Sequence, residues 1–598
     1  MASFDRLSTL SISRDVLSGA RSAVAVARDA LERIAAYEAI QPEVWISRAS
    51  ADQVLAQAEA VDRRIEAGEK PPLAGAPFAV KDNIDAAGLP TTAACPAFAY
   101  QPDANAPVVQ RLLDAGAVLL GKTNLDQFAT GLVGARSPYG ACGNVYNRDY
   151  VSGGSSSGSA VAVAAGLAAF ALGTDTAGSG RVPAAFNHLV GLKPTKGRWS
   201  TRGLVPACRT LDCITVFTSN VQDAAAVDAV VCGYDAEDPY SRRALADQGP
   251  AIPAHFNFAL PRPDQLEWFG DSQSARLFEA AVARVIAMGG RPVEFDLTPF
   301  SAAAALLYQG PWVAERTAAA LDLVTRSPGA IHPVVRQILE GGLRATAVEA
   351  FQAEYRLRGY QREAERLWET ADVMLLPTAA TTYRIREVLA EPMALNANLG
   401  RYTNFVNLLD MSAIALPAGF RDNGPGFGVS LIGPAWADAR LLDLARRFEE
   451  IAPMPEPPPI DLTGTRPTVK LAVVGAHLAA MPLHWQLTSR DARLVRRCKT
   501  APVYKLYAIA GSIPPKPALV HAGADGAAIE VEVYELEMAA FGSFVAEVPP
   551  PLAIGTVTLE DGSEVKGFVA EPRALAGADD ITAFGGWRAY IASVQAKA

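Results

Sequence analysis

Cysteine and histidine are scarce in this sequence, which has six of each among 598 residues. The cysteines form no CxxC pair, so they indicate neither a zinc cluster nor a disulfide framework. The histidines form no HExxH motif and no pair at ligand spacing. We therefore expect reduced thiols, a cytoplasmic protein, no bound metal and no cofactor.

The sequence also lacks an excess of basic residues and a long hydrophobic segment. Its formal net charge of −9 argues against nucleic acid and anionic membranes as main partners. The longest apolar run, residues 160–172, is too short to span a bilayer. The beginning, "MASFDRLSTLSISRD", lacks the basic and apolar regions of a signal peptide. A small molecule is the expected substrate.

Residues 451–468 contain six prolines and are predicted to form an extended linker between two domains. In residues 1–450, helical and strand patterns alternate, which indicates an α/β domain. One example is a helix from about Val108 to a stop at Gly116, followed by a buried strand over 117–120. Residues 469–598 read as a small α+β domain.

The second domain is predicted mainly from two β patterns. In "AIEVEVYEL", apolar residues alternate with glutamates, which predicts a half-exposed strand. "GTVTLEDGSEVKGFVA" predicts a hairpin with Asp561 and Gly562 at the turn.

Two Gly/Ser-rich turns, "VSGGSSSGSAVAVAAG" and "GTDTAGSGRVPAA", lie on either side of a buried apolar segment, read as a helix, and could meet at one site. Simple loops around a core helix would give the same pattern. A phosphate-binding loop would require a lysine after the glycines, and a GxSxG elbow would require strand–turn–helix framing. A serine nucleophile remains, and it would need a base.

Two residues are candidates for that base. His188 is close in sequence, but a lone histidine beside apolar residues is more often structural. Lys81 closes the short apolar run 77–80, so it could be buried or could reach the surface. A pKa near 7 instead of about 10.4 requires about 4.6 kcal/mol, which desolvation can supply.

Taken together, these segments resemble the amidase signature family. The motifs "PFAVKDNID", "GKTNLDQFATG", the two turns and "VGLKPTKG" follow in the family's order from about residue 74 to 197, and a looser likeness continues to about 447. The resemblance implies a mixed central sheet covered by helices and a Ser–cis-Ser–Lys triad. In this triad Ser179 is the nucleophile, Ser155 the bridging serine after a cis peptide bond, and Lys81 the base.

The same resemblance implies an oxyanion hole made by the backbone N–H groups of Thr176, Ala177 and Gly178. Ala177 and Gly180 depart from the more common family pattern, TDTGGSIR, and are similar to the allophanate hydrolase subfamily. "LVPACRTLDCITVF", "VVGAHLAAMPLHWQL" and "YKLYAIAG" resemble that subfamily too. The likeness implies a second domain of γ-glutamylcyclotransferase-like fold. Ammonia release from allophanate, a urea that carries a carboxylate, would be followed there by decarboxylation of N-carboxycarbamate.

In that subfamily a tyrosine and an arginine bind the substrate carboxylate. Tyr308 and Arg316 have the matching spacing, and eight positions would place them on one side of a helix. His477, after an expected strand over 471–474, is the candidate base of the second domain, with His484 as the weaker candidate. Each histidine could instead be structural.

Three further expectations concern partners and alternatives. We expect a homodimer, with a functional link to a urea carboxylase or to cyanurate breakdown. The alternative activity is that of another amidase-signature amidohydrolase, malonamidase-like or similar to the amide-hydrolysing component of a tRNA-dependent amidotransferase. A non-catalytic protein that retains the fold is disfavoured by the complete Lys81–Ser155–Ser179 set.

Overall fold

The computed structural model describes residues 5–244, 251–453, 455–460, 468–490 and 492–596. The chain divides into two compact units, Met1–Thr463 and Gly464–Ala598. Positions 454 and 461–467 of the predicted 451–468 linker lie outside the described residues, and the predicted domain limits remain a prediction. Within the described residues, no helix has both the length and the apolar character needed to cross a membrane.

The first unit is built on one mixed sheet, and this confirms the α/β prediction. Strand β2 runs parallel to β3 and β4, whereas β4 and β6 are antiparallel. The order across the sheet is β1 (Trp45–Arg48), β3 (Val118–Thr123), β2 (Pro77–Lys81), β4 (Phe170–Asp175), β6 (Cys213–Thr218), β5 (Val190–Lys193), β10 (Met411–Phe420), β11 (Gly426–Pro434), β9 (Val373–Pro377), β7 (Phe256–Pro261) and β8 (Gly290–Phe295).

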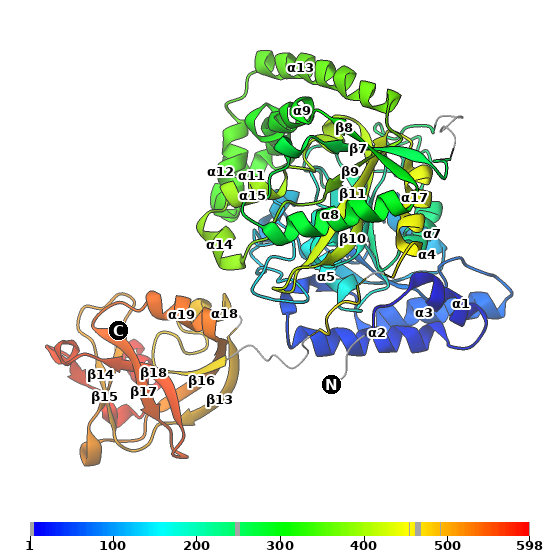
Figure 1. Ribbon diagram of the computed structural model, residues 1–598. Helices are drawn as coiled ribbons and strands as arrows, with labels where there is room; N and C mark the ends of the chain where they lie inside the picture. The colour runs from blue at the N-terminus through cyan, green and yellow to red at the C-terminus, as the bar shows by residue number, and fades with distance from the viewer. Residues whose placement is uncertain (1–4, 245–250, 454, 461–467, 491, 597–598) are drawn as a thin grey trace. The chain divides into compact units, whose positions relative to one another are not determined.

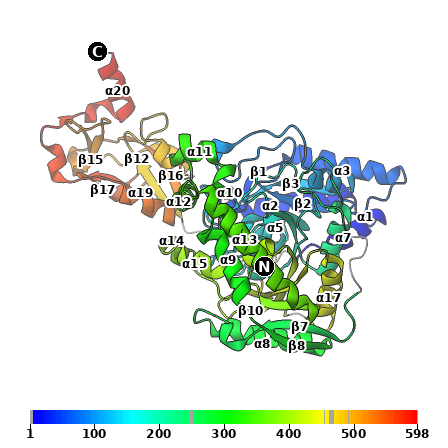
Figure 2. The same ribbon diagram turned by 90° about the horizontal axis from the view of Figure 1, so that it is seen from above.

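Helices cover this sheet: Figure 1 shows helix α8 crossing over β10 and β11, and Figure 2 shows α8 beside β7 and β8. Helix α4 begins at Pro107, one residue before the predicted start, and the chain turns at Gly116 before β3. The main helices of the unit are α1 (Thr9–Leu17), α2 (Ala23–Glu38), α3 (Ala51–Glu66), α4 (Pro107–Asp114), α5 (Ser157–Ala164), α6 (Val182–Phe186), α7 (Val221–Val231), α8 (Ser272–Ala287), α9 (Thr298–Gln309), α10 (Trp312–Ala319), α12 (Pro333–Gly342), α13 (Ala347–Glu365) and α17 (Asp438–Glu450).

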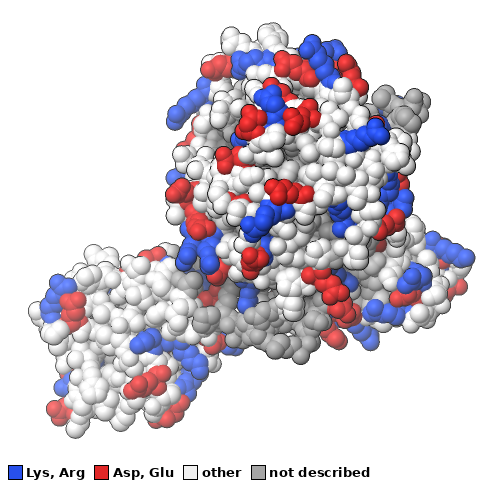
Figure 3. Space-filling view, in the orientation of Figure 1, with Lys and Arg blue, Asp and Glu red and all other residues white. Residues whose placement is uncertain are grey.

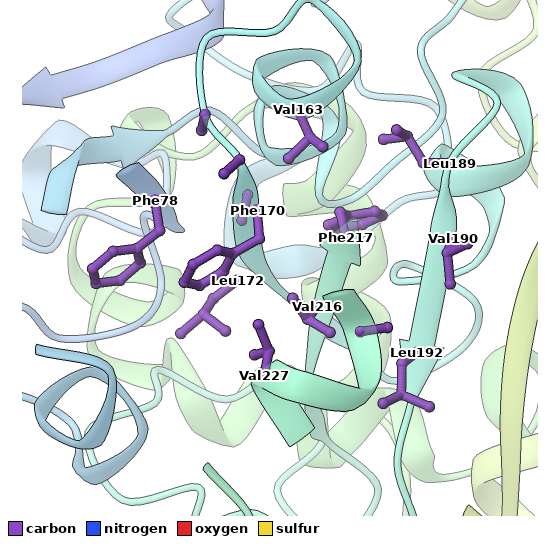
Figure 4. Close-up of a cluster of buried hydrophobic side chains, with 14 of the residues drawn as sticks. Phe78, Val163, Phe170, Leu172, Leu189, Val190, Leu192, Val216, Phe217 and Val227 are labelled. Atoms are coloured by element: carbon purple, nitrogen blue, oxygen red, sulfur yellow. The ribbon is translucent and has the colours of Figure 1, made fainter. Parts of the chain in front are cut away.

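The apolar run 160–172 is wholly buried, but it is not one helix as predicted. Helix α5 ends at Ala164, the chain turns at Gly166, and strand β4 begins at Phe170. Figure 4 shows this part of the core, where the rings of Phe78 on β2 and Phe170 on β4 stack with centroids 5.2 Å apart. The stack lies at the amino ends of the two strands, and their parallel pairing continues from Phe78 and Phe170 to Val80 and Leu172, which brings the carboxyl ends of β2 and β4 side by side.

The second unit is β-rich, as predicted. One sheet has the order β13 (Arg493–Lys499), β16 (Glu530–Glu537), β12 (Thr468–Val473), β18 (Glu564–Ala570) and β17 (Leu552–Thr558), and a smaller sheet contains β15 (Pro517–His521), β14 (Tyr504–Ala508) and β19 (Asp579–Asp580). Its helices are α18 (Trp485–Thr488), α19 (Met538–Ala546) and α20 (Trp587–Gln595). The predicted hairpin forms from β17 and β18 around Gly562.

The prediction of a half-exposed strand at β16 is wrong at Glu532. This glutamate is fully buried because Arg588 of α20 and the backbone at Ala479 cover it on its face of the sheet. Its carboxylate accepts hydrogen bonds from Arg588 Nη2 and Arg497 Nε, both at 2.9 Å, and from the Ala479 N–H at 2.7 Å. The alternating sequence therefore includes a buried carboxylate that is paired with two arginines whose side chains are partly exposed.

Candidate active site

Lys81 is the last residue of β2 and is fully buried. Its Nζ lies 2.7 Å from Ser155 Oγ and 2.6 Å from Thr174 Oγ1. Lys81 takes part in no ion pair among the described residues. Burial lowers the pKa of Lys81 to about 7, although the more distant carboxylates of Asp126, Asp212 and Asp175 oppose this shift. A substantial fraction of Lys81 is therefore neutral near pH 7, as a general base must be.

Ser155 follows a cis peptide bond from Gly154. A Cβ atom on Gly154 would lie 2.2 Å from Asp126 Oδ2 and 2.5 Å from Gly134 N, so only glycine fits there. The Gly154 N–H donates to Leu132 O at 2.8 Å, and the Asp126 N–H donates to Ser155 O at 3.1 Å. The first turn is thus fixed by close packing against the segment 126–134.

Ser179 lies in the second turn, between β4 and α6, and is 2 % exposed. Its Oγ is 3.5 Å from Gly131 O. The Asp175 carboxylate accepts hydrogen bonds from the Gly178 and Gly180 N–H groups, at 2.8 and 3.1 Å. It also binds Arg181 through Nε and Nη2, at 2.9 and 3.0 Å. One buried aspartate therefore fixes the shape of the turn that carries Ser179.

The backbone of this turn bears on the predicted oxyanion hole. The Gly178 N–H already donates to Asp175, whereas the N–H groups of Ala177 and Ser179 make no hydrogen bond to another described residue. The Thr176 hydroxyl donates to Asp212. Burial raises the pKa of Asp212 to about 6, with the Thr176 hydrogen bond opposing the shift. The Thr176 N–H makes no hydrogen bond to another described residue either, so the N–H groups of Thr176, Ala177 and Ser179 are free to donate to an oxyanion, whereas that of Gly178 makes a structural contact.

Tyr308 and Arg316 do not share one helix, contrary to prediction. Tyr308 is on α9 and Arg316 is on α10, and Gly310 and Pro311 separate the two helices. The side chains nevertheless meet, because the Arg316 guanidinium lies over the Tyr308 ring, 5.0 Å from its centroid. Arg316 is 2 % exposed, and its Nη1 donates to Thr130 Oγ1 at 3.4 Å.

His188 takes no part in this arrangement. It is buried, and its ring stacks on Phe420 with centroids 4.2 Å apart. Burial lowers the pKa of His188 to about 3, so the imidazole is neutral and structural.

In the second unit, His477 follows β12 and lines a cavity of about 260 Å³ with Gln486, Lys516 and Glu547. Its Nε2 lies 2.7 Å from Gln486 Oε1, and burial lowers its pKa. His484 is absent from the lining of this cavity, and its Nε2 lies 3.0 Å from the Tyr534 hydroxyl. The arrangement favours His477 over His484 as a candidate base.

Two family profiles match the chain. The profile described as amidase matches residues 27–442, and the profile described as allophanate hydrolase C-terminal domain matches residues 469–592. The chain belongs to the amidase family. The first match spans the sheet and both serine-bearing turns.

Relatives of this amidase include one with both of its units. The solved structure of Kluyveromyces lactis allophanate hydrolase is 41% identical, with a TM-score of 0.71, over 97% of this chain and 99% of that chain. Urea amidolyase of Saccharomyces cerevisiae is 43% identical over 92% of this chain and 31% of its own length. The chain thus spans about a third of the first curated relatives it matches. A glutamyl-tRNA(Gln) amidotransferase component from Synechococcus elongatus is 34% identical over 72% of this chain and 95% of its own length.

Sequence reasoning about the amidase unit missed the residues that support the two turns. Thr174 gives Lys81 its second hydroxyl partner, Asp175 fixes the Ser179 turn, and Asp212 binds Thr176 and the N–H groups of residues 207 and 208. Asp175 and Arg181 both stand within "TDTAGSGR", so a buried acid and base around one turn could have suggested their pairing. Asp212 had no such local signal.

Proposed function

We propose that this amidase hydrolyses allophanate to ammonia and carbon dioxide in two stages, one in each unit. The observation that carries the proposal is the match of both units to one solved allophanate hydrolase. The contact between Arg316 and Tyr308 supports it, because a fixed buried guanidinium suits a substrate carboxylate. The amidotransferase alternative is not favoured, since the two-unit match includes residues 469–592.

In the first stage, neutral Lys81 accepts the proton of Ser155 as Ser155 accepts that of Ser179. Ser179 Oγ forms a bond to the terminal carbonyl carbon of allophanate. The oxyanion that develops is stabilised by backbone donors of the second turn, for which Thr176, Ala177 and Ser179 are available. The bond between this carbon and the terminal NH₂ nitrogen then breaks. The nitrogen receives the proton back through Ser155 and leaves as ammonia.

Water next attacks the acyl-enzyme, with Lys81 and Ser155 again accepting a proton, and Ser179 is released. The product is N-carboxycarbamate, which carries two carboxylates on one nitrogen. In the second stage we propose that it enters the cavity of the second unit, where Lys516 offers a positive charge. His477 takes up a proton from solvent and gives it to the nitrogen as the bond between nitrogen and one carboxylate breaks and carbon dioxide leaves. When Gln486 Oε1 accepts from Nε2, His477 Nδ1 carries the lone pair for this transfer. The carbamate that remains takes up a second proton and breaks down to the second ammonia and a second carbon dioxide.

Further proposals concern the source of the substrate, the oligomeric state and the location of the protein. A urea carboxylase would supply allophanate, and cyanurate breakdown is a second source. A homodimer and a cytoplasmic location remain proposals as well. On the face shown in Figure 3, acidic and basic residues are interspersed, with no broad basic patch for nucleic acid.

A substrate panel tests the proposed function. Purified protein receives allophanate, malonamate, biuret and a glutaminyl amide, and released ammonia is counted. We expect allophanate to be the preferred substrate and to yield two molecules of ammonia. Ser179→Ala should abolish release with an unchanged circular dichroism spectrum, and Ser155→Ala should reduce it strongly. Preference for the glutaminyl amide, or near-native release by Ser179→Ala, would contradict the proposal.

The two stages are separable in the same assay. His477→Ala should leave release of the first ammonia unchanged and slow release of the second, because N-carboxycarbamate then breaks down without the protein. His484→Ala serves as the matched control, since His484 does not line the cavity. Equal behaviour of the two variants would remove His477 from the second stage.

A further inference from the structure

Two buried arginine side chains, those of Arg136 and Arg316, contact the same residue, Thr130. Arg136 and Arg316 are each 2 % exposed. Arg136 Nη1 donates to Thr130 O at 3.1 Å and Arg136 Nη2 donates to Pro392 O at 2.5 Å, so this guanidinium has two carbonyl partners but no anionic one. Arg316 Nη1 donates to Thr130 Oγ1 at 3.4 Å. The two guanidinium groups therefore approach one threonine from two different segments of the chain.

Neither arginine takes part in an ion pair among the described residues. The Nε atoms of Arg136 and Arg316 are also buried without a hydrogen-bond partner there. Buried charges in proteins are usually paired, because an unpaired charge loses its hydration without compensation. Two unpaired guanidinium groups at one place indicate that an anion completes the site.

Asp126, the carboxylate beside Arg136, does not fill this role. Its Oδ1 accepts the backbone N–H of Arg136 at 2.9 Å. Its Oδ2 accepts the N–H groups of Val133 and Gly134, at 3.2 and 3.0 Å. Burial lowers the pKa of Arg136, Asp126 opposes the shift, and the positive charge of Arg316 adds to it. The repulsion between the guanidinium groups of Arg136 and Arg316 therefore needs another negative group to offset it.

The position of the pair relative to the nucleophile points to the substrate. Thr130 precedes Gly131, whose carbonyl oxygen lies 3.5 Å from Ser179 Oγ. Arg136 and Tyr308 line a cavity of about 870 Å³. Arg316 is not among the lining residues, but its guanidinium lies over the ring of Tyr308, which is one of them. Thr130, which both guanidinium groups contact, is therefore the sequence neighbour of the residue that Ser179 Oγ contacts.

We propose that Arg136 is a second specificity-determining residue, which binds the substrate carboxylate together with Arg316 and restricts the amidase to amides that carry a nearby negative charge. This inference rests on the proposed function and deepens it. Two guanidinium groups can donate to both oxygens of one carboxylate, whereas a neutral amide in that position would leave both cations unpaired. Discrimination between allophanate and biuret then depends on Arg136 as well as on Arg316.

Binding without turnover gives the most direct test. Malonamate is allophanate with CH₂ in place of NH, and malonamide is its neutral counterpart. Isothermal titration is performed on Ser179→Ala protein with and without Arg136→Gln. We expect malonamate to bind at least ten times more weakly to the Arg136→Gln protein, and malonamide affinity to change less than threefold. Arg344→Gln, at an exposed residue that lines the same cavity, is the matched control and should change neither affinity.

Activity gives a second readout that loss of structure alone would not reproduce. In the protein with Ser179 intact, Arg136→Gln should lower kcat/KM for allophanate at least tenfold and lower that for biuret by less than threefold. Arg136→Lys keeps the charge but loses the fork, so it should give an intermediate loss. If Arg136→Gln does not fold, the Arg136→Lys protein decides the question.

Three results separate the possible failures. Unchanged malonamate affinity in both Arg136 variants, or equal losses for malonamate and malonamide in folded protein, would overturn the role of Arg136. Absence of ammonia release from allophanate in the unaltered protein would overturn the proposed function instead. In that case, selective loss of malonamate binding would still support an anion site at Arg136.

Discussion

Two lysines on neighbouring strands are fully buried, yet their surroundings differ. Lys81 ends β2, and Lys122 stands on the adjacent parallel strand β3, paired in register with Val80. Lys122 Nζ lies 3.1 Å from Asp82 Oδ1, 3.0 Å from Thr91 Oγ1 and 3.2 Å from Pro90 O. Lys81 contacts two hydroxyl groups. Burial alone therefore does not make a base; the partners of the buried amine decide its role.

The electrostatics follow from these contacts. Burial lowers the pKa of both lysines, and at Lys122 the adjacent Asp82 opposes the shift by direct contact. At Lys81 the opposing carboxylates act from a greater distance and accept hydrogen bonds from other groups. We interpret Lys122 as a structural ammonium with its counterion, and Lys81 as the amine that exchanges protons with Ser155.

The largest expected difference between the two lysines is in activity, when each is replaced by arginine. Lys81→Arg should lower kcat/KM for allophanate by about 10³–10⁴, because a guanidinium stays protonated and cannot serve as a base. Lys122→Arg keeps the charge beside Asp82 and should lose less than about tenfold. The measurement is steady-state ammonia release from both variants, with circular dichroism as the folding control. An active Lys81→Arg protein would show that Lys81 is not the general base.

Removing the amine of Lys122 should affect stability instead of chemistry. Lys122→Met leaves the buried Asp82 carboxylate without its cation, and the free energy of unfolding should fall by about 3–5 kcal/mol. Urea denaturation followed by tryptophan fluorescence measures this change. Lys122→Met/Asp82→Asn should recover part of the loss, since no charge is then left unpaired. Unchanged stability in Lys122→Met would mean that the pair does not anchor β3.

The low pKa of Lys81 should itself appear in stability. Between pH 7 and 10 the unfolded chain binds a proton at residue 81 that the folded protein largely does not. The free energy of unfolding should therefore rise with pH by about 3 kcal/mol more in the unaltered protein than in Lys81→Met. Urea denaturation at four pH values in this interval measures the difference. A constant difference would indicate an ordinary lysine.

A smaller effect is expected at the proposed carboxylate site of the amidase unit. A charge-assisted pair contributes about 1.5–3 kcal/mol, so Arg316→Ala should lower kcat/KM for allophanate about ten- to more than a hundredfold. Biuret, with a neutral amide in place of the carboxylate, should be affected far less. Tyr308→Phe keeps the ring under the guanidinium and should cost only a few-fold. Equal losses on the two substrates in folded Arg316→Ala protein would exclude carboxylate recognition.

Sequence reasoning reached the elements whose signal is local. The apolar run before Lys81 allowed either a buried or a surface lysine, and clustered glycine and serine marked the two turns; the family resemblance then selected Lys81, Ser155 and Ser179. The pairing of Tyr308 with Arg316 was anticipated from spacing, but the break at Gly310 was not. No sequence motif pointed to Arg136. It lies near Arg316 only because both side chains contact Thr130, and Arg316 belongs to a distant segment of the chain. The burial of Glu532 was not predicted because the residues that cover it, Ala479 and Arg588, are more than 50 positions away in the sequence.

The pH dependence of ammonia release tests the central claim, that neutral Lys81 activates Ser179 through Ser155, most directly. The profile of kcat/KM for allophanate should rise through an apparent pKa near 7 to a plateau, because only the neutral amine accepts a proton. Asp212→Asn should keep this limb, which would separate it from the carboxyl of Asp212, whose pKa is about 6. A rate that is independent of pH from 6 to 9, or that falls above pH 7, would contradict the account.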